Sequence, residues 1–248
     1  MLNRFLLLLI TGLALSACAS SQKVNPQDPW ENTNRAIYRF NEGFDNYITR
    51  PVSTTYQTIT PNWLNVGFSN FFNNLGDVPN SLNNFLQAKP VESLSDLGRV
   101  CINSTIGLAG LFDVATPIGL TRHNEDFGQT LAVWGFDSGN YLVLPLLGPS
   151  TVRDGVGWVG DFQTEPYYYV NDKTAYYSLF LLDAIDTRAD LLSASRILEQ
   201  ASLDPYTFHR ETYLQRRKGL IYDGNPPIEG PSLDELDLLD EMEITPAK

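Results

Sequence analysis

Residues 123–151 read HNEDFGQTLAVWGFDSGNYLVLPLLGPST, and this stretch decides what kind of fold the chain adopts. From Gly128 to Val152 the only charged side chain is Asp137, so the window is as apolar and as long as a membrane-spanning helix. Glycines and prolines interrupt it at Gly128, Gly135, Gly139, Pro145, Gly148 and Pro149. These residue types break regular helices, and irregular backbone at membrane depth is tolerated only where it is buried in protein or lines a wet cavity. The sequence leaves both possibilities open.

A second window, from Arg99 to Arg122, also contains a single charged side chain, Asp113. Its periodicity predicts a helix over residues 99–114 that places three small or polar residues on one line, Asn103, Gly107 and Gly110. About fifteen helical residues cannot cross a hydrocarbon layer of about 30 Å. The helix is therefore expected either to be buried in a core or to be seated part-way into lipid, with its small-residue line against a neighbour or a lumen. Cys101 in the same run is expected to be a buried small hydrophobe.

Amphipathic helices are predicted for most of the remaining chain. They are expected at residues 33–46 and 63–75, from 79, from 150, at 172–199 and from 205 to near 219 or 224, with an extended segment at 140–148. Ser150 and Asp172 are expected to cap the helices that follow them, and Asp204-Pro205 to open the last helix. Several polar faces carry Asn and Ser in place of the charged residues that normally cover water-soluble helices. With 13 Phe, 12 Tyr and 4 Trp, this pattern favours a protein that partly meets lipid and partly lines a narrow wet space. An ordinary aromatic-rich helical core is the alternative, and both imply a mainly α fold with little or no β structure.

The start of the chain predicts export and lipidation. A short apolar run ends in Leu15-Ser16-Ala17-Cys18, the pattern of a bacterial lipobox, so residues 1–17 are expected to be cleaved as a signal peptide. Cys18 is then expected to carry a covalent diacylglycerol and an N-acyl chain, which together form a stable anchor. Ala19 stands where an Asp commonly favours inner-membrane retention, so the outer membrane is the expected location.

Three further segments follow the signal peptide. Residues 18–29 are expected to be a lipid-anchored linker, residues 30–224 one helical domain, and residues 225–248 an acidic tail. The tail holds seven acids and one lysine, so we expect it to be disordered or weakly helical. It is either a solvated terminus or a docking tail for a basic partner.

No constellation of catalytic or metal-binding residues stands out in the sequence. The two histidines, His123 and His209, belong to no zinc motif, and neither a nucleophile elbow nor a phosphate-binding loop occurs. His123 with Glu125 and Asp126 is expected to be a solvated or helix-capping cluster, with a metal site as the alternative, and Asp137 a turn residue. A lipid hydrolase that uses His123 or Asp137 for catalysis is the enzymatic alternative. A net charge of −12 without a basic patch excludes nucleic acid as a partner. We therefore expect no enzyme activity, no metal and no cofactor beyond the acyl chains on Cys18.

Several runs together carry a family resemblance. The most specific is Glu125-Asp126-Phe127-Gly128-Gln129-Thr130-Leu131, followed by Trp134-Gly135, Gly139, Tyr141 and Leu144-Pro145-Leu146-Leu147-Gly148-Pro149-Ser150. Other runs are Asp28-Pro29-Trp30-Glu31, Phe68-Ser69-Asn70-Phe71-Phe72-Asn73-Asn74-Leu75, Asn103-Ser104-Thr105-Ile106-Gly107 and Tyr213-Leu214-Gln215-Arg216-Arg217. From the lipobox to about residue 224 the chain resembles the MlaA (VacJ) family of outer-membrane lipoproteins. Ala88-Lys89 departs from the family pattern, since a glycine is expected there.

The resemblance implies a ring-like helical protein seated in the periplasm-facing leaflet of the outer membrane and associated with a trimeric porin. Such a protein removes misplaced phospholipids from the outer leaflet through an amphipathic channel. It hands them to a periplasmic lipid-binding protein that feeds an inner-membrane ABC transporter complex, and this retrograde transport maintains lipid asymmetry. The alternative function is a structural lipoprotein that braces a porin or envelope complex without its own lipid channel.

On this resemblance, the predicted helices at 63–75 and 99–114 and the run 127–150 are expected to form the membrane-seated ring. The helix at 33–46 is expected at the edge of the ring, where it would help control opening. Candidates for channel lining or gating are Tyr38, Phe40, Asn41, Asn103, Gly107, Gly110, Gly128, Gly135 and Gly139. An uncharged polar and glycine lining would spare a phosphate the large cost of entering hydrocarbon.

Overall fold

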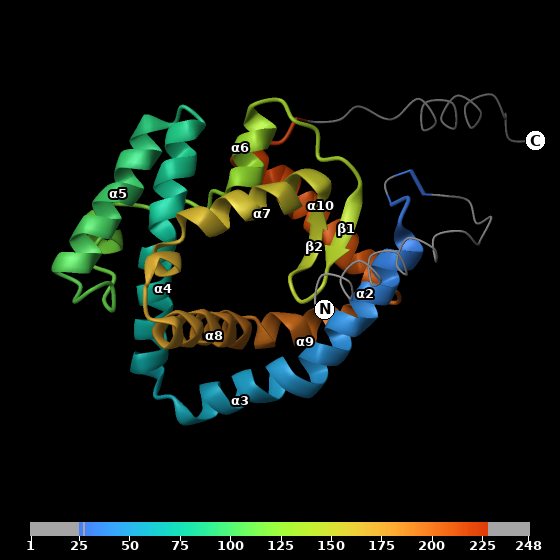
Figure 1. The fold of residues 1–248 in the computed structure, drawn as a ribbon, viewed down its shortest axis with the longest axis horizontal. Coiled ribbons are helices and arrows are strands. Elements are labelled where there is room, and N and C mark those ends of the chain that lie inside the picture. Colours follow the sequence, from blue (N-terminus) through green and yellow to red (C-terminus); the bar gives the residue numbers. More distant parts are fainter. Residues whose placement is uncertain (1–24, 27, 228–248) are drawn as a thin grey trace, which may run out of the picture.

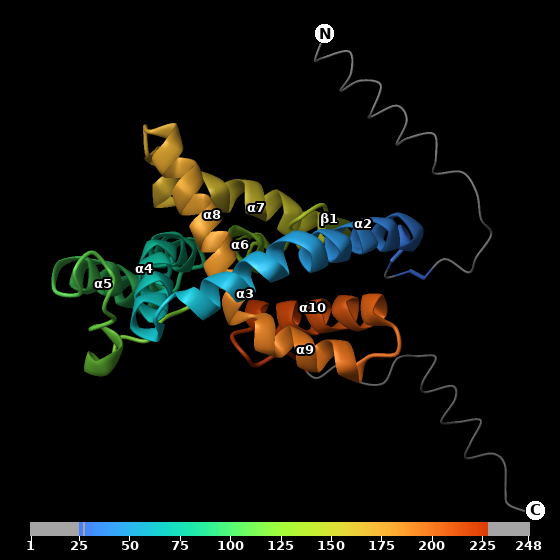
Figure 2. The same cartoon turned by 90° about the horizontal axis from the view of Figure 1, so that it is seen from below.

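The structure, a computed structural model, describes residues 25–26 and 28–227, which fold into a ring of helices with one small β-hairpin (Figure 1). The elements in chain order are α2 (Glu31–Phe44), η1 (Asp45–Thr49), α3 (Arg50–Ile59), α4 (Asn62–Leu86), α5 (Pro90–Thr105), η2 (Thr116–Ile118), α6 (Phe127–Val133), β1 (Tyr141–Leu144), β2 (Gly148–Thr151), α7 (Val152–Thr164), η3 (Pro166–Tyr169), α8 (Lys173–Asp190), α9 (Leu192–Ala201) and α10 (Pro205–Ile221). Figure 2 shows that α9 and α10 lie on one face of the ring, and that α8 runs toward them from the other face. The predicted mainly α class is confirmed.

The first side of the ring is one long curved helix. The predicted helix at 33–46 is found as α2, but the chain stays helical through the π-helical η1 and on through α3, because Asp45 and Arg50 keep right-handed helical dihedral angles. Asp45 then ties this side to α8, since its two carboxylate oxygens accept bonds of 2.6 and 2.7 Å from the Arg188 guanidinium.

α4 is a single helix of 25 residues, and the prediction of a separate helix starting at Pro79 is wrong. A proline inside a helix costs about 3 kcal/mol because it removes a backbone bond and crowds the preceding turn. Packing against α5 offsets this cost: Pro79 is buried, and the Ser81 and Ser93 hydroxyls donate to each other's backbone carbonyls at 2.9 and 2.8 Å. Ala88, just after the helix, has a φ of +60°, which explains why a glycine is the expected residue there.

α5 ends at Thr105, so the predicted helix over 99–114 is wrong in its second half. Leu108, Ala109 and Gly110 all take positive φ values, and the chain turns back on itself. The Asn103 side-chain oxygen holds this turn by accepting bonds from the backbone N–H groups of Val114 and Ala115 at 2.8 and 3.0 Å. A side chain at Gly107 would meet the Phe112 carbonyl oxygen at 2.1 Å, so the glycine permits a tight loop that a helical periodicity does not reveal.

The extended segment predicted at 140–148 is confirmed only for β1, because residues 145–147 form the turn of an antiparallel hairpin and Gly148 begins its second strand. β1 pairs with β2 from Tyr141 opposite Thr151 to Leu144 opposite Gly148, and Pro145 lies in the turn between the strands. Thr151, one residue later than the predicted Ser150, caps α7. The predicted cap Asp172 is confirmed, since its side chain accepts the Ala175 backbone N–H at the start of α8, and Asp204, predicted to open the last helix, accepts that of Thr207 at the start of α10. The single helix predicted over 172–199 is wrong, because α8 ends at Asp190 and α9 begins at Leu192.

The ring buries polar side chains and exposes apolar ones, which is the reverse of a water-soluble globular protein. Within residues 28–227 the buried side chains are mostly polar or charged, including Asp77, Asn83, Asn84 and Asp96 from α4 and α5. Large apolar side chains lie outside: Trp63 is 73% exposed, Val91 74% and Leu94 68%. Soluble proteins bury such residues and expose few contiguous apolar patches. The apolar outer faces are therefore suited to lipid or to a partner.

No helix within residues 28–227 combines the length and apolarity that a membrane crossing requires. Cys101, predicted to be buried, is exposed, because it lies on the outward apolar face of α5 with Leu94 and Leu97. The predicted signal peptide, Cys18, most of the linker and almost all of the acidic tail lie outside the described residues.

Candidate functional site

A cavity of about 690 Å³ lies between the first side of the ring, the hairpin turn, α7 and α8. We call it the central cavity. Its wall consists of Asn41, Glu42, Phe44, Asp45, Thr49, Leu146, Leu147, Gly148, Trp158, Asp161, Phe162, Glu165, Tyr167, Phe180, Asp183, Ala184, Thr187, Arg188 and Leu191. Polar groups and large apolar groups thus share one wall, which suits an amphiphilic ligand.

The wall carries carboxyl groups that the sequence analysis missed. Burial and the neighbouring carboxylates of Asp183 and Asp161 raise the pKa of Glu165 to about 7. Burial and Asp126 raise the pKa of Asp161 to about 6, and burial and Asp186 raise the pKa of Asp183 to about 6. Asp161 and Glu165 are four residues apart at the end of α7, and this like-charged pair amid aromatic residues is the signal that could have found them.

Among the nine sequence candidates, the central cavity wall includes Asn41 and none of the other eight. The Asn41 side-chain amide donates to the Leu144 carbonyl at 2.9 Å and accepts from the Leu146 backbone N–H at 2.8 Å. Leu146 has a φ of +64°, so the amide holds a strained turn at the rim of the cavity. Asn41 therefore positions the hairpin turn against α2.

Asn34, which was not among the sequence candidates, makes the same kind of contact three residues earlier in the hairpin. Its side chain donates to the Tyr141 carbonyl at 3.1 Å and accepts from the Val143 backbone N–H at 2.9 Å. Asn34 and Asn41 are seven residues apart, so they lie on the same face of α2. Asp28 fixes Asn34 by accepting a bond of 2.8 Å, and also accepts bonds from Tyr206 and Arg210.

The remaining candidates on α2 lie beside this contact. Tyr38 packs edge-on against Tyr206 and His209, with ring centroids 5.7 and 5.4 Å apart. Phe40 is 56% exposed and lies one helical turn before Phe44 of the cavity wall. Tyr38 thus belongs to the packing under the hairpin, and Phe40 is an exposed ring on α2 near the cavity.

The three glycine candidates in the run 127–150 have different surroundings. Gly128 lies where α6 crosses α7: a side chain there would come within 2.4 Å of the Arg217 guanidinium. Gly135 and Gly139 have φ values of +92° and +65° and are exposed in the segment between α6 and β1. They permit turns that other residues rarely adopt.

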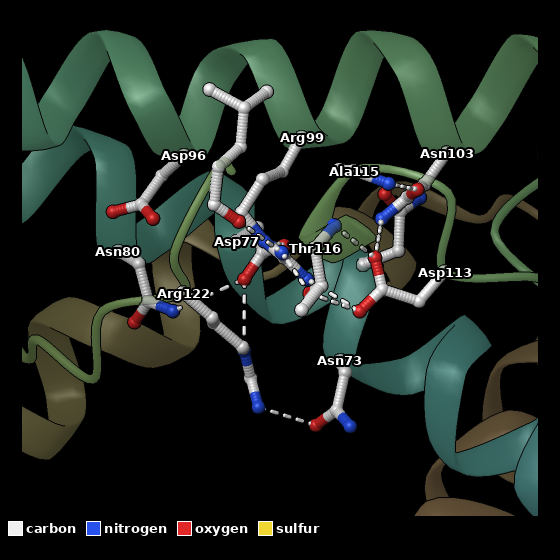
Figure 3. Close-up of polar contacts among 12 residues, drawn as sticks. Asn73, Asp77, Asn80, Asp96, Arg99, Asn103, Asp113, Ala115, Thr116 and Arg122 are labelled. Carbon is white, nitrogen blue, oxygen red and sulfur yellow. Dashed lines mark hydrogen bonds and ion pairs between the residues drawn. The ribbon is translucent and has the colours of Figure 1, made fainter. Parts of the chain in front are cut away.

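Asn103 belongs to α5, and Gly107 and Gly110 to the loop after it. Figure 1 shows α5 on the far side of α4 from α7 and α8, which line the cavity, and Figure 3 shows Asn103 beside a buried ion network. Asp77, fully buried, accepts bonds from Arg99 Nε at 2.9 Å and Arg122 Nε at 2.8 Å. Arg99 also donates to Thr116 and to the Leu120 carbonyl, both at 2.8 Å. This network joins α4, α5 and the loop after α5 without a buried apolar core.

A second ion cluster adjoins the central cavity. Arg217 of α10 bonds Asp126 at the start of α6 and Asp154 of α7, the latter at 3.0 Å. Smaller cavities of about 230 and 290 Å³ flank it, and the first shares Leu147, Trp158 and Asp161 with the central cavity. The cluster therefore lies beside the central cavity, in the wall of the smaller cavity that shares these three residues with it.

The residues considered for catalysis have structural environments. His123 Nδ1 lies 2.9 Å from the buried Asp96, and Asp126 caps α6 by accepting the Gln129 backbone N–H. Asp137 is exposed in the segment before β1. Within residues 28–227 no group of three or more His, Cys, Asp or Glu side chains has a metal-binding arrangement.

Comparison with known proteins identifies the family of this fold. The family model described as MlaA lipoprotein matches residues 26–219. Two relatives named "Intermembrane phospholipid transport system lipoprotein MlaA" match most of the chain. The Escherichia coli protein is 34% identical over 228 residues, which are 88% of this chain and 89% of the relative. The Haemophilus influenzae protein is 29% identical over 244 residues, which are 95% of this chain and 96% of the relative. The chain belongs to the MlaA family.

A solved structure described as "Structural basis for maintenance of bacterial outer membrane lipid asymmetry" has a similar fold. Its TM-score is 0.69 at 33% identity, over 80% of this chain and 99% of that chain. The MlaA match spans the whole wall of the central cavity, from Asn41 to Leu191, and both ion clusters. The family resemblance is thereby confirmed for the part of the chain that contains the candidate site.

Proposed function

We propose that the chain transports phospholipids, removing them from the outer leaflet of the outer membrane through the central cavity and so maintaining lipid asymmetry. The observation that carries this proposal is a polar and aromatic cavity inside a ring whose outer faces are apolar. A phospholipid needs polar partners for its headgroup and apolar contact for its tails, because a buried charge without partners is very costly. The central cavity offers both.

The same proposal includes the location and the partners. The ring is anchored by acyl chains on Cys18 in the periplasm-facing leaflet and associates with a trimeric porin through its outer apolar faces. It releases phospholipid to a periplasmic lipid-binding protein that feeds an inner-membrane ABC transporter complex. Transport makes and breaks no covalent bond, so the chain acts without enzyme activity.

The alternative function is a lipoprotein that only braces a porin or envelope complex. The apolar outer faces would serve that role equally well, but it gives the central cavity no purpose. A change that fills the cavity and leaves the outer faces intact therefore separates the two functions.

The experiment uses a bacterial strain lacking its own copy of the gene, complemented with the full lipidated chain. Phospholipid in the outer leaflet is measured by labelling surface amines with a membrane-impermeant reagent. We expect the intact chain to restore a low signal and Ala184→Trp, which places an indole in the cavity wall, to leave it high. Ala194→Trp on the exposed side of α9 is the matched control and is expected to restore it.

Protein level and helical circular dichroism must be the same for both variants. If Ala184→Trp restores asymmetry as fully as Ala194→Trp at equal protein level, transport through the central cavity is refuted and the bracing function is favoured.

A further inference from the structure

The central cavity has an unbalanced charge. Its wall contains five carboxyl side chains, those of Glu42, Asp45, Asp161, Glu165 and Asp183. Among the described residues of this wall, Arg188 is the single basic one. Its Nε and Nη2 atoms bond the two oxygens of Asp45 at 2.6 and 2.7 Å, so that carboxylate neutralises it. Of the other four, Asp161 lies near Arg217 of the adjoining ion cluster, and Glu42, Glu165 and Asp183 have no basic counterpart in the wall.

Aromatic rings stand among these carboxyl groups. Five line the cavity: Phe44, Trp158, Phe162, Tyr167 and Phe180. Trp158 and Phe162 are stacked with centroids 5.7 Å apart and an angle of 30° between the rings, so both belong to one aromatic surface on α7. The face of an aromatic ring is negative and attracts ammonium groups, most strongly for Trp. Carboxylates and ring faces therefore favour the same class of ligand group.

We infer that the central cavity selects phospholipids by headgroup charge, accepting headgroups that carry an ammonium group in preference to headgroups that carry no positive charge. An ammonium group next to the lipid phosphate is attracted by the carboxylates and by the ring faces. A glycerol headgroup has no positive charge, so the negative phosphate is repelled by the carboxylates of the wall. The inference rests on the proposed function, since it names the lipid class that the same cavity transports.

Glu165 and Asp183 are the residues to which we assign this selectivity. They come from the end of α7 and from α8, and both line the central cavity. The two groups are close enough to interact, because the Asp183 carboxylate contributes to the raised pKa of Glu165. A nearby ammonium group relieves that repulsion, whereas an anionic headgroup increases it.

The test measures which lipid the purified protein retains. The full lipidated chain, in mild detergent at pH 8, is incubated with an equimolar mixture of phosphatidylethanolamine and phosphatidylglycerol with identical acyl chains, and the lipids that remain bound after gel filtration are quantified by mass spectrometry. We expect the ethanolamine lipid to be enriched about fivefold, which corresponds to the strength of one cation–π or ion contact. Glu165→Gln with Asp183→Asn should lower the enrichment to about onefold without lowering the total bound lipid.

Asp137→Asn with Glu211→Gln removes the same charge from exposed positions outside the cavity wall and should keep the fivefold enrichment. Equal retention of both lipids by the parent protein overturns the inference and leaves the proposed function standing. If the parent protein retains neither lipid, the proposed function itself fails. Enrichment that persists in the cavity variant overturns the assignment to Glu165 and Asp183.

Discussion

Asp77 of α4 is the carboxylate that bonds both Arg99 of α5 and Arg122 of the loop after α5. It is fully buried and receives bonds from two guanidinium groups, Arg99 Nε at 2.9 Å and Arg122 Nε at 2.8 Å (Figure 3). Asp77→Asn keeps the size of the side chain and removes its charge. Arg99, only 3% exposed, would then be a buried cation whose nearest acid is Asp113, 3.4 Å from its Nη2 atom. Arg122 is 31% exposed and regains water more easily.

The expected loss of stability follows from this difference in burial between Arg99 and Arg122. Removing one member of a buried ion pair costs about 3–5 kcal/mol, because it leaves an uncompensated charge. Asp113 compensates part of it, so we expect Asp77→Asn to lower the free energy of unfolding by about 3 kcal/mol. For a domain of about 200 residues this corresponds to a fall of about 6–12 °C in the unfolding temperature.

Thermal unfolding of the purified chain in detergent, followed by helical circular dichroism, measures the loss. Asp137→Asn makes the same chemical change at an exposed position and should leave the midpoint within about 2 °C of the parent, as surface substitutions usually do. If Asp77→Asn unfolds at the same temperature as Asp137→Asn, the network does not hold α4 to α5, and the account of a fold held by polar contacts is wrong.

Three further predictions concern the other parts of the ring. The raised pKa of Glu165, about 7, means that the folded state binds more protons than the unfolded state between about pH 4.5 and pH 7, so stability falls as pH rises through that window. Glu165→Gln should therefore raise the free energy of unfolding by about 1–2 kcal/mol at pH 8, a value reduced because the side chain is partly exposed to water. In denaturant titrations this stabilisation should vanish below about pH 5. A stabilisation independent of pH would contradict the raised pKa of Glu165. Gly157→Ala should lower the free energy of unfolding by about 1–3 kcal/mol, because the new methyl group would lie 2.4 Å from the Gly128 nitrogen. Gly219→Ala, whose methyl group would meet nothing within 4 Å, should lose no stability in the same titration. Phe40→Ala should change surface phospholipid without unfolding the protein, and unchanged surface labelling would count against a role for α2 in opening.

Local chemistry made the helices of this chain predictable. The caps Asp172 and Asp204 need only the next three residues to be recognised, and both are found. Pro79 shows the limit of such reasoning, because the contacts with α5 that offset its cost involve residues about twelve positions away. The end of α5 was missed for a related reason: Asn103 accepts bonds from residues eleven and twelve positions later, and no periodicity encodes that turn.

The cavity wall was harder to predict than the helices. Asn103, Gly107 and Gly110 were predicted as lining because they are small or polar and uncharged. They belong to α5 and the loop after it, and none of them is in the cavity wall. The acidic members of the wall come from α2 and η1 on one side and from the end of α7 and α8 on the other, more than 110 residues later, so they become neighbours only when the ring closes. Asn41 was found because it stands next to an aromatic stripe on a well-predicted helix, so its place on α2 followed from the sequence even though its bonds to the hairpin did not.

The abundance of asparagine has a physical explanation in the contact between α2 and the hairpin. A two-stranded hairpin leaves the outer edge of β1 with unpaired N–H and C=O groups, and such an edge must be covered where water is scarce. Asn34, with one donor and one acceptor, pairs with two of these backbone groups, the Tyr141 carbonyl and the Val143 N–H, in the way that a third strand would. Asn41 does the same for the Leu144 carbonyl at the end of β1 and the Leu146 N–H in the turn. A lysine or glutamate at these positions offers only donors or only acceptors, and adds a charge that needs its own partner. An amide satisfies both kinds of group without a net charge, which is what a polar interior inside an apolar surface requires.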